Sequence, residues 1–253
     1  PSNCNKIIVD NVLLFSAKIT ELFYPDSITD DDNHNVNLIK EIYPNISAGK
    51  NTLIGKNVTI GNNTKIGHNT IIEKNVIVGS NAYIGSNVIL RNTIIEDNVN
   101  ILDGAIVGKK GFGFFPDKLS NHRYPHIGYV LIKKNSEIGS CSTVDRGSSS
   151  VTIIGENTFL DNQVHLGHNV KIGKNCMIAG QVGFAGSSIL GNNVIIGGQA
   201  GISGHLKIGN NVKIGGGSGV VNDLPDNSKV MGYPAIPLRE FVKLRKKPWI
   251  KIQ

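Results

Sequence analysis

The sequence predicts an all-β solenoid, a parallel β-helix built from six-residue repeats. From residue 48 to residue 220, an aliphatic or small apolar residue recurs at every sixth position with few interruptions. The next residue is usually Gly, and a small or β-branched residue comes four positions along, as in Ile60-Gly61-Asn62-Asn63-Thr64. Twelve successive matches in one phase, from Ile154 to Val220, argue against chance in a chain rich in Ile, Gly and Asn.

The repeat positions fall into two runs. The first holds Ala48, Ile54, Ile60, Ile66, Ile72, Val78, Ile84, Leu90 and, after a one-residue slip, Ile95 and Ile101. The second holds Ile132, Ile138, Val144 and, after another slip, Ile154, Leu160, Leu166, Ile172, Ile178, Phe184, Leu190, Ile196, Ile202, Ile208, Ile214 and Val220. We expect three units, roughly eighteen residues, to complete a triangular turn with the aliphatic side chains inside. Gly or Asn should take each corner, where positive φ is needed.

Residues 1–44 do not follow the repeat, and we expect them to form a remnant or shortened N-terminal domain. The apolar stretch from Val12 to Tyr24 predicts a short helix that ends before Pro25, followed by an acidic loop from Asp26 to Asp32. This segment is too small for a core of its own. The β-helix itself should occupy residues 45–222.

Two further segments break the pattern. The repeat stops over residues 108–131, an insert that begins Gly108-Lys109-Lys110-Gly111-Phe112-Gly113-Phe114, and a loop of this length in a solenoid is usually functional. Residues 223–253 contain a Gly232-Tyr233-Pro234 turn and a predicted helix from Leu238 to Arg245. We expect this C-terminal helix to cap the open end of the coil and hide unpaired strand edges.

Composition indicates a soluble, cytoplasmic protein. No segment of the 253 residues is apolar over the roughly eighteen residues that a membrane span needs, and no signal-peptide pattern opens the chain. The three cysteines, Cys4, Cys141 and Cys176, are too widely separated for a metal or disulfide framework, which suits a reducing compartment. Cys176 falls on an inward position of the repeat and is expected in the core.

The formal net charge of +7 is concentrated near the C-terminus. The basic residues there are Arg239, Lys243, Arg245, Lys246, Lys247 and Lys251, against a single Glu240. Such a cluster can bind nucleic acid, anionic lipid or an acidic protein, or it can be a solvated helix face. The charge pattern alone leaves these alternatives open.

The repeat phase singles out one edge that carries histidines. His168 is the second residue after Leu166, which places it at a corner facing outward, and Gly186 lies eighteen residues further, one coil above it. His205 follows about two coils along the same edge. The spacing suggests His168 as a general base, the N–H of Gly186 as an oxyanion donor and His205 as a second polar contact. The alternative is that these histidines are ordinary surface residues.

Other chemistries have less support in the sequence. A zinc site needs ligands that converge on one point, whereas His165 and His168 share a rung and His205 is two coils away, so we expect no metal. The chain has no Ser-His-Asp order and no phosphate-binding loop of the Gly-x-x-x-x-Gly-Lys type.

Several motifs, taken together, resemble the UDP-3-O-(3-hydroxyacyl)glucosamine N-acyltransferases of lipid A (lipopolysaccharide) biosynthesis, a hexapeptide-repeat acyltransferase family. The matching stretches are Gly111-Phe112-Gly113-Phe114, Thr143-Val144-Asp145-Arg146-Gly147, Leu160-Asp161-Asn162-Gln163-Val164, Gly167-His168-Asn169-Val170, Gly180-Gln181-Val182-Gly183-Phe184-Ala185-Gly186-Ser187, Gly204-His205 and Gly232-Tyr233-Pro234-Ala235. Their order and spacing over residues 108–240 are more specific than the hexad alone.

The resemblance implies a left-handed coil and a homotrimer with active sites between neighbouring prisms. It implies transfer of a 3-hydroxyacyl group from acyl carrier protein to the 2-amine of a UDP-sugar, with His168 as catalytic base, His205 as second histidine and Gly186 as oxyanion position. Substrate contacts are expected from Asp161, Asn162, Gln163, Phe112 and Phe114, and carrier-protein contacts from Arg239, Lys243, Arg245, Lys246 and Lys247. No cofactor is expected beyond the carrier's phosphopantetheine, and no nucleic acid or membrane segment is implied.

One departure leaves alternatives open. The family's N-terminal domain has roughly a hundred residues, whereas about forty precede the coil here, so the nucleotide contacts are less secure than the acyl-transfer chemistry. The sister O-acyltransferase acting on UDP-N-acetylglucosamine and an acetyl-coenzyme A sugar acetyltransferase are enzymatic alternatives. A non-catalytic structural or ice-binding solenoid is the alternative from another class, although its outward residues should then be ranked Thr rather than mixed Asn, Lys, Ile and Thr.

Overall fold

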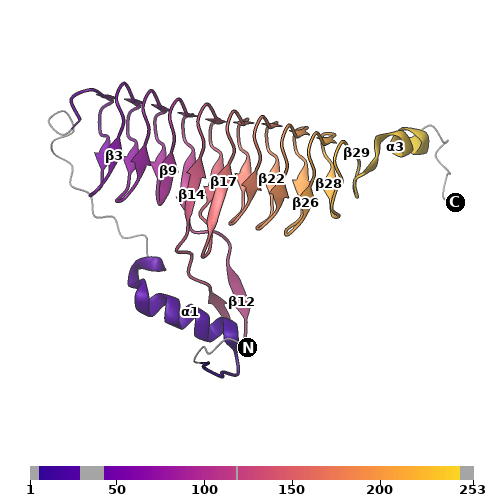
Figure 1. The fold of residues 1–253 in the computed structure, drawn as a ribbon, viewed down its shortest axis with the longest axis horizontal. Coiled ribbons are helices and arrows are strands. Elements are labelled where there is room, and N and C mark those ends of the chain that lie inside the picture. Colours follow the sequence, from indigo (N-terminus) through magenta and orange to yellow (C-terminus); the bar gives the residue numbers. More distant parts are fainter. Residues whose placement is uncertain (1–5, 29–42, 118, 246–253) are drawn as a thin grey trace.

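Short parallel strands stack into a long solenoid that carries a helix and a hairpin below it and a helix at its C-terminal end (Figure 1). The computed structural model describes residues 6–28, 43–117 and 119–245. Three sheets of 11, 9 and 8 strands form the faces of the prism. Before and after the insert, each successive strand along the chain joins the next face, so strands three apart in sequence are neighbours in one sheet; β12 and β13 of the insert form a separate sheet. The predicted parallel β-solenoid is confirmed.

We number the three faces by their first strands. Face 1 contains β1 (Ser47–Ala48), β4 (Lys65–Ile66), β7 (Tyr83–Ile84), β10 (Asn100–Ile101), β15 (Glu137–Ile138), β18 (Phe159–Leu160), β21 (Met177–Ile178), β24 (Ile195–Ile196), β27 (Lys213–Ile214), β29 (Lys229–Met231) and β30 (Ile236–Pro237). Face 2 contains β2 (Leu53–Ile54), β5 (Ile71–Ile72), β8 (Ile89–Leu90), β11 (Ile106–Lys109), β16 (Thr143–Asp145), β19 (His165–Leu166), β22 (Gly183–Phe184), β25 (Gly201–Ile202) and β28 (Gly219–Val220). Face 3 contains β3 (Thr59–Ile60), β6 (Ile77–Val78), β9 (Thr93–Ile95), β14 (Tyr129–Ile132), β17 (Val151–Ile154), β20 (Lys171–Ile172), β23 (Ile189–Leu190) and β26 (Lys207–Ile208).

The strand register follows the predicted eighteen-residue turn. On face 2, His165 pairs with Gly183, and Gly183 pairs with Gly201. The insert lengthens one turn to 37 residues on all three faces, as where Asn100 of β10 pairs with Glu137 of β15. The turns on either side of it deviate less, with spacings of 17 and 22 residues. The insert therefore leaves the stack of coils continuous.

The core is one column of aliphatic side chains inside the prism. The second residue of nearly every two-residue strand is buried, as the repeat predicts, and Phe184 is the largest fully buried side chain. Cys176 is also buried there, as expected. The first run extends one step beyond the prediction, because Val107 of β11 is fully buried before the insert begins.

The corners differ from the prediction in one respect. Positive φ occurs at the third residue after the aliphatic position, mostly Asn, as at Asn63 (φ 60°). The Gly directly after the aliphatic position, such as Gly61, has no positive φ. It is Gly because an added Cβ would lie 2.4 Å from the backbone nitrogen of Ser80 in the next coil. The repeat thus uses Asn for backbone conformation and Gly for close packing of coils.

One edge of the prism, between faces 3 and 1, is a ladder of asparagines. We call it the asparagine edge; in the C-terminal half it consists of Asn157, Asn175, Asn193, Asn211 and Asn227. The carboxamide Nδ2 of each of the first four donates to Oδ1 of the next, at 2.9, 3.3, 3.0 and 3.1 Å. The asparagines therefore satisfy one another as well as the left-handed backbone.

The N-terminal segment contains the predicted helix, α1 (Val12–Phe23), which ends before Pro25 and a 3-10 turn η1 (Pro25–Ser27). Its N-cap is Asn11, whose side chain accepts from the backbone N–H of Leu14. Most of the predicted acidic loop lies outside the described residues. The insert forms an antiparallel hairpin, β12 (Phe114–Pro116) with β13 (Asn121–Arg123), and lies beside α1 (Figure 1). Ser16 and Tyr124 join the two through a 2.9 Å hydroxyl contact.

The C-terminal helix, α3 (Leu238–Arg245), forms as predicted beyond the last coil and contacts β29 and β30 (Figure 1). Its cap is partial, because Leu238, Val242 and Leu244 are still 39%, 44% and 56% exposed. Of the helices within the described residues, none has the length and apolar character to cross a membrane.

Candidate functional site

A groove with a volume of about 720 Å³ runs along the outer surface of face 2 and the edge between faces 2 and 3. The described residues that line it include His165, His168, Phe112, Asp145, Gly183, Gly186, Gly201, Gly219 and Tyr233. The groove contains His168 and Gly186, two of the three residues predicted to be catalytic.

Glycines form the floor of this groove. His165 occupies an outward position of face 2, and in the next three coils that position is Gly183, Gly201 and Gly219. An added Cβ at Gly183 or Gly201 would meet nothing within 4 Å, so the coil does not need Gly there. At Gly219 it would lie 1.8 Å from Cδ2 of Tyr233, whose ring therefore covers this glycine. The result is an open trough that ends at Tyr233.

His168 and Gly186 lie one above the other on the edge between faces 2 and 3, as predicted. The backbone N–H of Ser187 donates to the carbonyl of His168 at 2.8 Å, which links the two coils. An added Cβ at Gly186 would lie 2.7 Å from both Cε1 and Nε2 of His168. The Nε2 side of the imidazole therefore faces Gly186, whose own N–H donates to no backbone carbonyl among the described residues.

His205 extends the same edge by one more coil. Its backbone N–H donates to the carbonyl of Gly186 at 3.1 Å, and its φ is 62°, so it occupies the left-handed corner position that is Asn elsewhere. The side chain is exposed and does not line the groove. We call His168, Gly186 and His205 the histidine edge.

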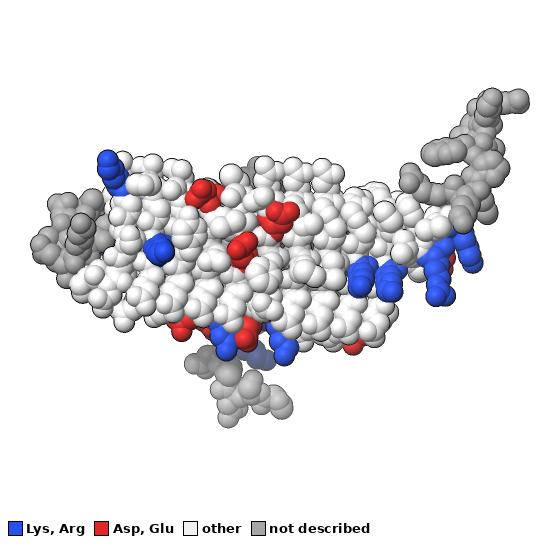
Figure 2. Space-filling model, turned by 90° about the horizontal axis from the view of Figure 1, so that it is seen from above, with Lys and Arg blue, Asp and Glu red and all other residues white. Residues whose placement is uncertain are grey.

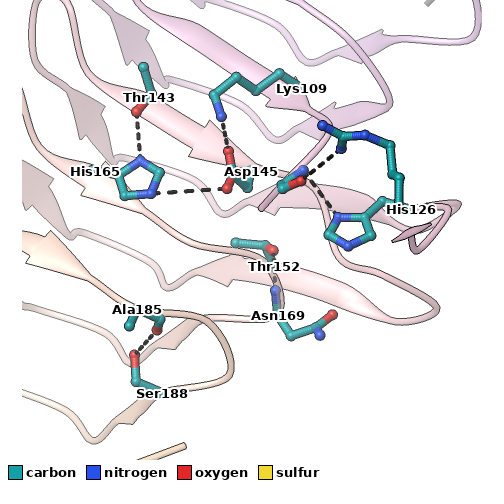
Figure 3. Close-up of polar contacts among 11 residues, drawn as sticks. Lys109, His126, Thr143, Asp145, Thr152, His165, Asn169, Ala185 and Ser188 are labelled. Carbon is teal, nitrogen blue, oxygen red and sulfur yellow. Dashed lines mark hydrogen bonds and ion pairs between the residues drawn. The ribbon is translucent and has the colours of Figure 1, made fainter. Parts of the chain in front are cut away.

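Asn169 contacts the far nitrogen of the His168 ring. Its Nδ2 lies 3.1 Å from Nδ1 of His168, while its Oδ1 accepts from the backbone N–H of Ser148 at 2.9 Å and from the hydroxyl of Ser150 at 3.0 Å. The backbone of Asn169 is also fixed, because its N–H donates to Oγ1 of Thr152 (Figure 3). Asn169 thus fixes the plane of the imidazole and leaves Nε2 toward the groove.

A buried carboxylate, that of Asp145, also lines the groove. Asp145 on β16 is 2% exposed, is ion-paired with Lys109 on β11, and has Oδ2 4.0 Å from Nε2 of His165 (Figure 3). Nδ1 of His165 is 2.7 Å from Oγ1 of Thr143. The sequence analysis did not assign a role to Lys109 or Asp145. Lys109 and Asp145 are 36 residues apart with most of the insert between them, so their spacing does not predict the ion pair. The only signal in the sequence is the acidic residue within the Thr143–Gly147 motif.

The surroundings of His168 favour its neutral form. Half-burial lowers the pKa of His168 below 6.5; the carboxylate of Asp145 acts in the opposite direction and the nearby His205 adds to the lowering. An imidazole with a lowered pKa is uncharged at neutral pH and can accept a proton.

The insert places Phe112 in the groove, but Phe114 outside it. Phe112 is 82% exposed and packs edge-to-face on Phe114 with ring centroids 5.0 Å apart. The guanidinium of Arg123 lies 4.4 Å above the ring of Phe114, a cation–π contact. Phe114 therefore supports Phe112 from behind, and the substrate-binding role of both remains a prediction.

The other predicted substrate residues lie on a different edge. Asp161, Asn162 and Gln163 form the corner between faces 1 and 2, and none of them lines the groove that contains His168. Gln163 accepts from Nε2 of Gln181 at 2.8 Å, and Gln181 accepts from Gln199 at 2.8 Å, so a glutamine ladder runs along this edge. Within one chain, the structure does not bring these residues to His168.

The basic C-terminal residues are only partly described. Arg239 and Lys243 are exposed on α3, whereas Lys246, Lys247 and Lys251 lie outside the described residues, and of Arg245 only the backbone is described. Figure 2 shows Lys and Arg side chains gathered at this end of the molecule. Exposed Lys213 and Lys229, which pair in face 1, add positive charge near α3.

Comparison with known proteins finds similar repeats in bacterial acyltransferases. Residues 51–86 and 152–186 match the family model described as bacterial transferase hexapeptide (six repeats). A UDP-3-O-acylglucosamine N-acyltransferase of Agrobacterium fabrum is 51% identical over 146 residues, which are 58% of this chain and 41% of that protein. One from Dechloromonas aromatica is 49% identical over 72 residues, 28% of this chain and 21% of that protein. The matched segments thus span about two fifths or less of these relatives.

A solved structure shares the architecture over a longer stretch. The UDP-N-acetylglucosamine acyltransferase of Francisella novicida superimposes with a TM-score of 0.70 at 25% identity, covering 80% of this chain and 74% of that one. The fold and the repeats are those of a hexapeptide-repeat β-solenoid. Over the matched segments, the chain is similar in sequence to UDP-3-O-acylglucosamine N-acyltransferases.

Proposed function

We propose that this protein transfers a 3-hydroxyacyl group from acyl carrier protein to the 2-amine of a UDP-3-O-acylglucosamine, in lipid A biosynthesis in the cytoplasm. The observation that carries the proposal is the histidine edge: an imidazole with a lowered pKa lies against a glycine of the next coil, at the side of an open groove. The sequence relatives that are named as N-acyltransferases support the choice of acceptor.

In the proposed reaction, the amine attacks the thioester carbonyl directly. The C–N bond forms and the C–S bond breaks, while Nε2 of His168 takes a proton from the attacking amine and passes it to the departing thiolate of the phosphopantetheine. The N–H of Gly186 donates to the carbonyl oxygen as negative charge develops on it. No covalent enzyme intermediate is needed, because both substrates are held in line.

Base catalysis at Nε2 requires the neutral ring to carry its proton on Nδ1. The Nδ2 of Asn169 faces that atom at 3.1 Å, an arrangement in which Nδ1 accepts and the ring proton is on Nε2. A half-turn of the Asn169 carboxamide presents Oδ1 to Nδ1–H instead, at the cost of its present hydrogen bonds with Ser148 N–H and with the hydroxyls of Ser148 and Ser150. We infer that this turn accompanies substrate binding and converts His168 into a base at Nε2.

The groove and the surrounding charges supply the binding. The glycine trough at Gly183 and Gly201 is open to an extended, unbranched ligand. It is closed at one end by Tyr233 over Gly219, and Phe112 also lines the groove with an aromatic surface. The exposed cations Arg239, Lys243, Lys213 and Lys229 suit an acidic carrier protein at the C-terminal end. A homotrimer would bring a neighbour's Asp161, Asn162 and Gln163 toward the groove, which is how these residues could contact substrate.

An O-acyltransferase acting on UDP-N-acetylglucosamine is the second candidate, because the Francisella novicida structure with that name shares the fold over most of this chain. The insert with Phe112 and the sequence relatives favour the N-acyl reaction. Mass spectrometry distinguishes the two. The chain is incubated with 3-hydroxyacyl carrier protein and either UDP-3-O-acylglucosamine or UDP-N-acetylglucosamine, and acetyl-coenzyme A replaces the carrier protein in a third reaction. An amide product from the amine acceptor supports the proposal, and an ester product alone or acetylation alone refutes it.

A further inference from the structure

One buried histidine of the insert is not used by the proposed mechanism. His126 lies just before β14, is 2% exposed, and packs edge-to-face against His168 with ring centroids 5.0 Å apart. A ring in this place can control how His168 is oriented and how well it is hydrated.

The insert holds His126 from two directions. The backbone N–H of Gly111 donates to its Nδ1 at 3.1 Å, and Nε of Arg146 donates to its carbonyl at 2.7 Å. Nη1 of Arg146 also donates to Oδ1 of Asn92 at 2.8 Å, which ties the arrangement to face 3. Because Nδ1 accepts, the uncharged ring carries its proton on Nε2.

The two glycines around Phe112 are required by this packing. An added Cβ at Gly111 would lie 3.0 Å from Cβ of His168 and 2.9 Å from Cε1 of His126. At Gly113 it would lie 2.3 Å from Nε2 of His126. The Gly111-Phe112-Gly113 segment therefore packs against the imidazole of His126 and the Cβ of His168 while it places Phe112 in the groove.

We propose that His126 is a positioning residue: its uncharged ring, wedged between Gly111, Gly113 and His168, holds the His168 imidazole against Gly186 and couples it to the loop that carries Phe112. The proposal rests on the proposed function of His168 as base. It also gives the insert a role, because a ligand that moves Phe112 would act on His168 through His126.

The charges around the two rings agree with an uncharged wedge. The pKa of His126 is lowered from 6.5 to about 4, chiefly by burial and then by the charges of His168, Arg146, Arg123 and Lys109 in that order. Among the described residues, the titratable groups that act on His168 are Asp145, His205 and His126 itself. His126 is thus uncharged at neutral pH, and it packs against His168 without adding charge.

The test compares His126→Ala, which removes the wedge, with His126→Gln, which keeps an acceptor for Gly111 N–H and most of the volume. His122→Gln is the matched control, since His122 is on the same insert but stacks on Phe115. Imidazole ¹⁵N NMR follows the titration of His168, and kcat and KM are measured against pH. For His126→Ala we expect the His168 pKa to rise by about one unit and kcat at pH 6.5 to fall about tenfold, with KM within about twofold. His126→Gln and His122→Gln should remain within about threefold of the parent in kcat.

An unchanged His168 titration and unchanged kcat in His126→Ala would overturn the proposal. If His126→Ala does not fold, the same test applies to His126→Asn, which keeps an acceptor but withdraws from His168, and the same upward shift is expected. The NMR titration needs no substrate. A parent chain without acyl-transfer activity would therefore refute the proposed function, while the titration would still decide the role of His126.

Discussion

The asparagine edge and the histidine edge share one corner geometry, yet only the histidine edge borders the groove. Both place a residue with positive φ at the same point of each coil, for example Asn193 (φ 58°) and His205 (φ 62°). On the asparagine edge, each carboxamide is paired with the next. On the histidine edge, the positive-φ column is Asn169, Ser187 and His205, and the groove opens beside His168 and Gly186, each one residue before it.

The difference indicates that the regular coil determines where outward residues lie. The identity of a few of these residues determines which contacts they offer to a ligand. Any two outward residues eighteen apart in an uninterrupted stretch lie one coil apart, about 4.8 Å. A glycine above a histidine therefore brings a backbone amide to the imidazole without any special loop. The five predictions that follow compare changes at the two edges.

The largest effect is expected for His168→Ala, which removes the base from the histidine edge. We expect N-acyl transfer to fall by about 10³-fold, because general-base catalysis contributes on the order of 10²–10⁴. Steady-state turnover with the carrier-protein donor measures it. The control is Asn193→Gly, which truncates the asparagine edge without backbone strain and should leave turnover unchanged. Undiminished turnover in His168→Ala would refute the role of this residue.

The next largest effect is expected for Gly186→Ala. The new methyl group would lie 2.7 Å from the His168 ring and must displace it. We expect kcat to fall about 10²-fold, the order of effect seen when an oxyanion donor or a positioned base is lost. Gly216→Ala is the control, because Gly216 does not line the groove and its new Cβ would be 3.2 Å from the carbonyl oxygen of Gly198. Equal rates for the two variants would contradict a shared site at His168 and Gly186.

A smaller loss is expected at His205. Its φ of 62° makes Ala a strained replacement, so His205→Asn is the cleaner change. Because the side chain lies outside the groove, we expect a loss of about tenfold, well below that of His168→Ala. Comparing kcat and KM for the two variants tests the ranking. Losses of the same size would mean that both histidines belong to one catalytic unit.

Replacing Asn169 with Asp should change the pH dependence of kcat. In the parent chain, the pKa of His168 lies below 6.5. His168 therefore becomes protonated, and kcat declines, only at a pH below 6.5. In Asn169→Asp, one carboxylate oxygen accepts from Ser148 N–H and the other from Nδ1–H of His168, which favours the base tautomer and raises its pKa. We expect the acidic limb to move up by about one pH unit. A limb that does not move would exclude control of His168 by residue 169.

The smallest effect concerns the charges near α3. If Arg239 and Lys243 attract an acidic carrier protein, raising the salt from about 50 to about 300 mM should weaken its binding several-fold, since exposed charges are screened over about 10 Å or less. Arg239→Ala with Lys243→Ala should reduce the salt dependence. Calorimetry or surface plasmon resonance measures both. Carrier-protein binding that does not change with salt would indicate that these residues form an ordinary solvated helix face.

The fold was predictable because its contacts are periodic. Repeat positions six apart and corner positions eighteen apart follow from the sequence alone, and this is how Gly186 could be placed over His168. The role of the Gly after each aliphatic residue was wrong, since close packing between coils is a contact that no local φ rule reveals. Gly61 against Ser80 illustrates it.

The rest of the site was not predictable for a related reason. The insert has no period, so nothing in the sequence places His126 against His168 or Lys109 against Asp145, 36 residues away. The carboxamide of Asn169 was likewise visible as a motif residue but not as a partner of Nδ1. Long-range contacts made by irregular segments depend on a folded path that local patterns do not encode.

A crystal structure of the chain with UDP-3-O-acylglucosamine and a non-transferable acyl carrier analogue tests the central claim most directly. The account predicts that the acceptor amine lies within hydrogen-bond distance of Nε2 of His168, that the acyl carbonyl oxygen accepts from the N–H of Gly186, and that Oδ1 of Asn169 faces Nδ1. A reacting carbonyl that is out of reach of both His168 and Gly186 would contradict it, whether it lies elsewhere in the groove or along the ladder of Gln163, Gln181 and Gln199.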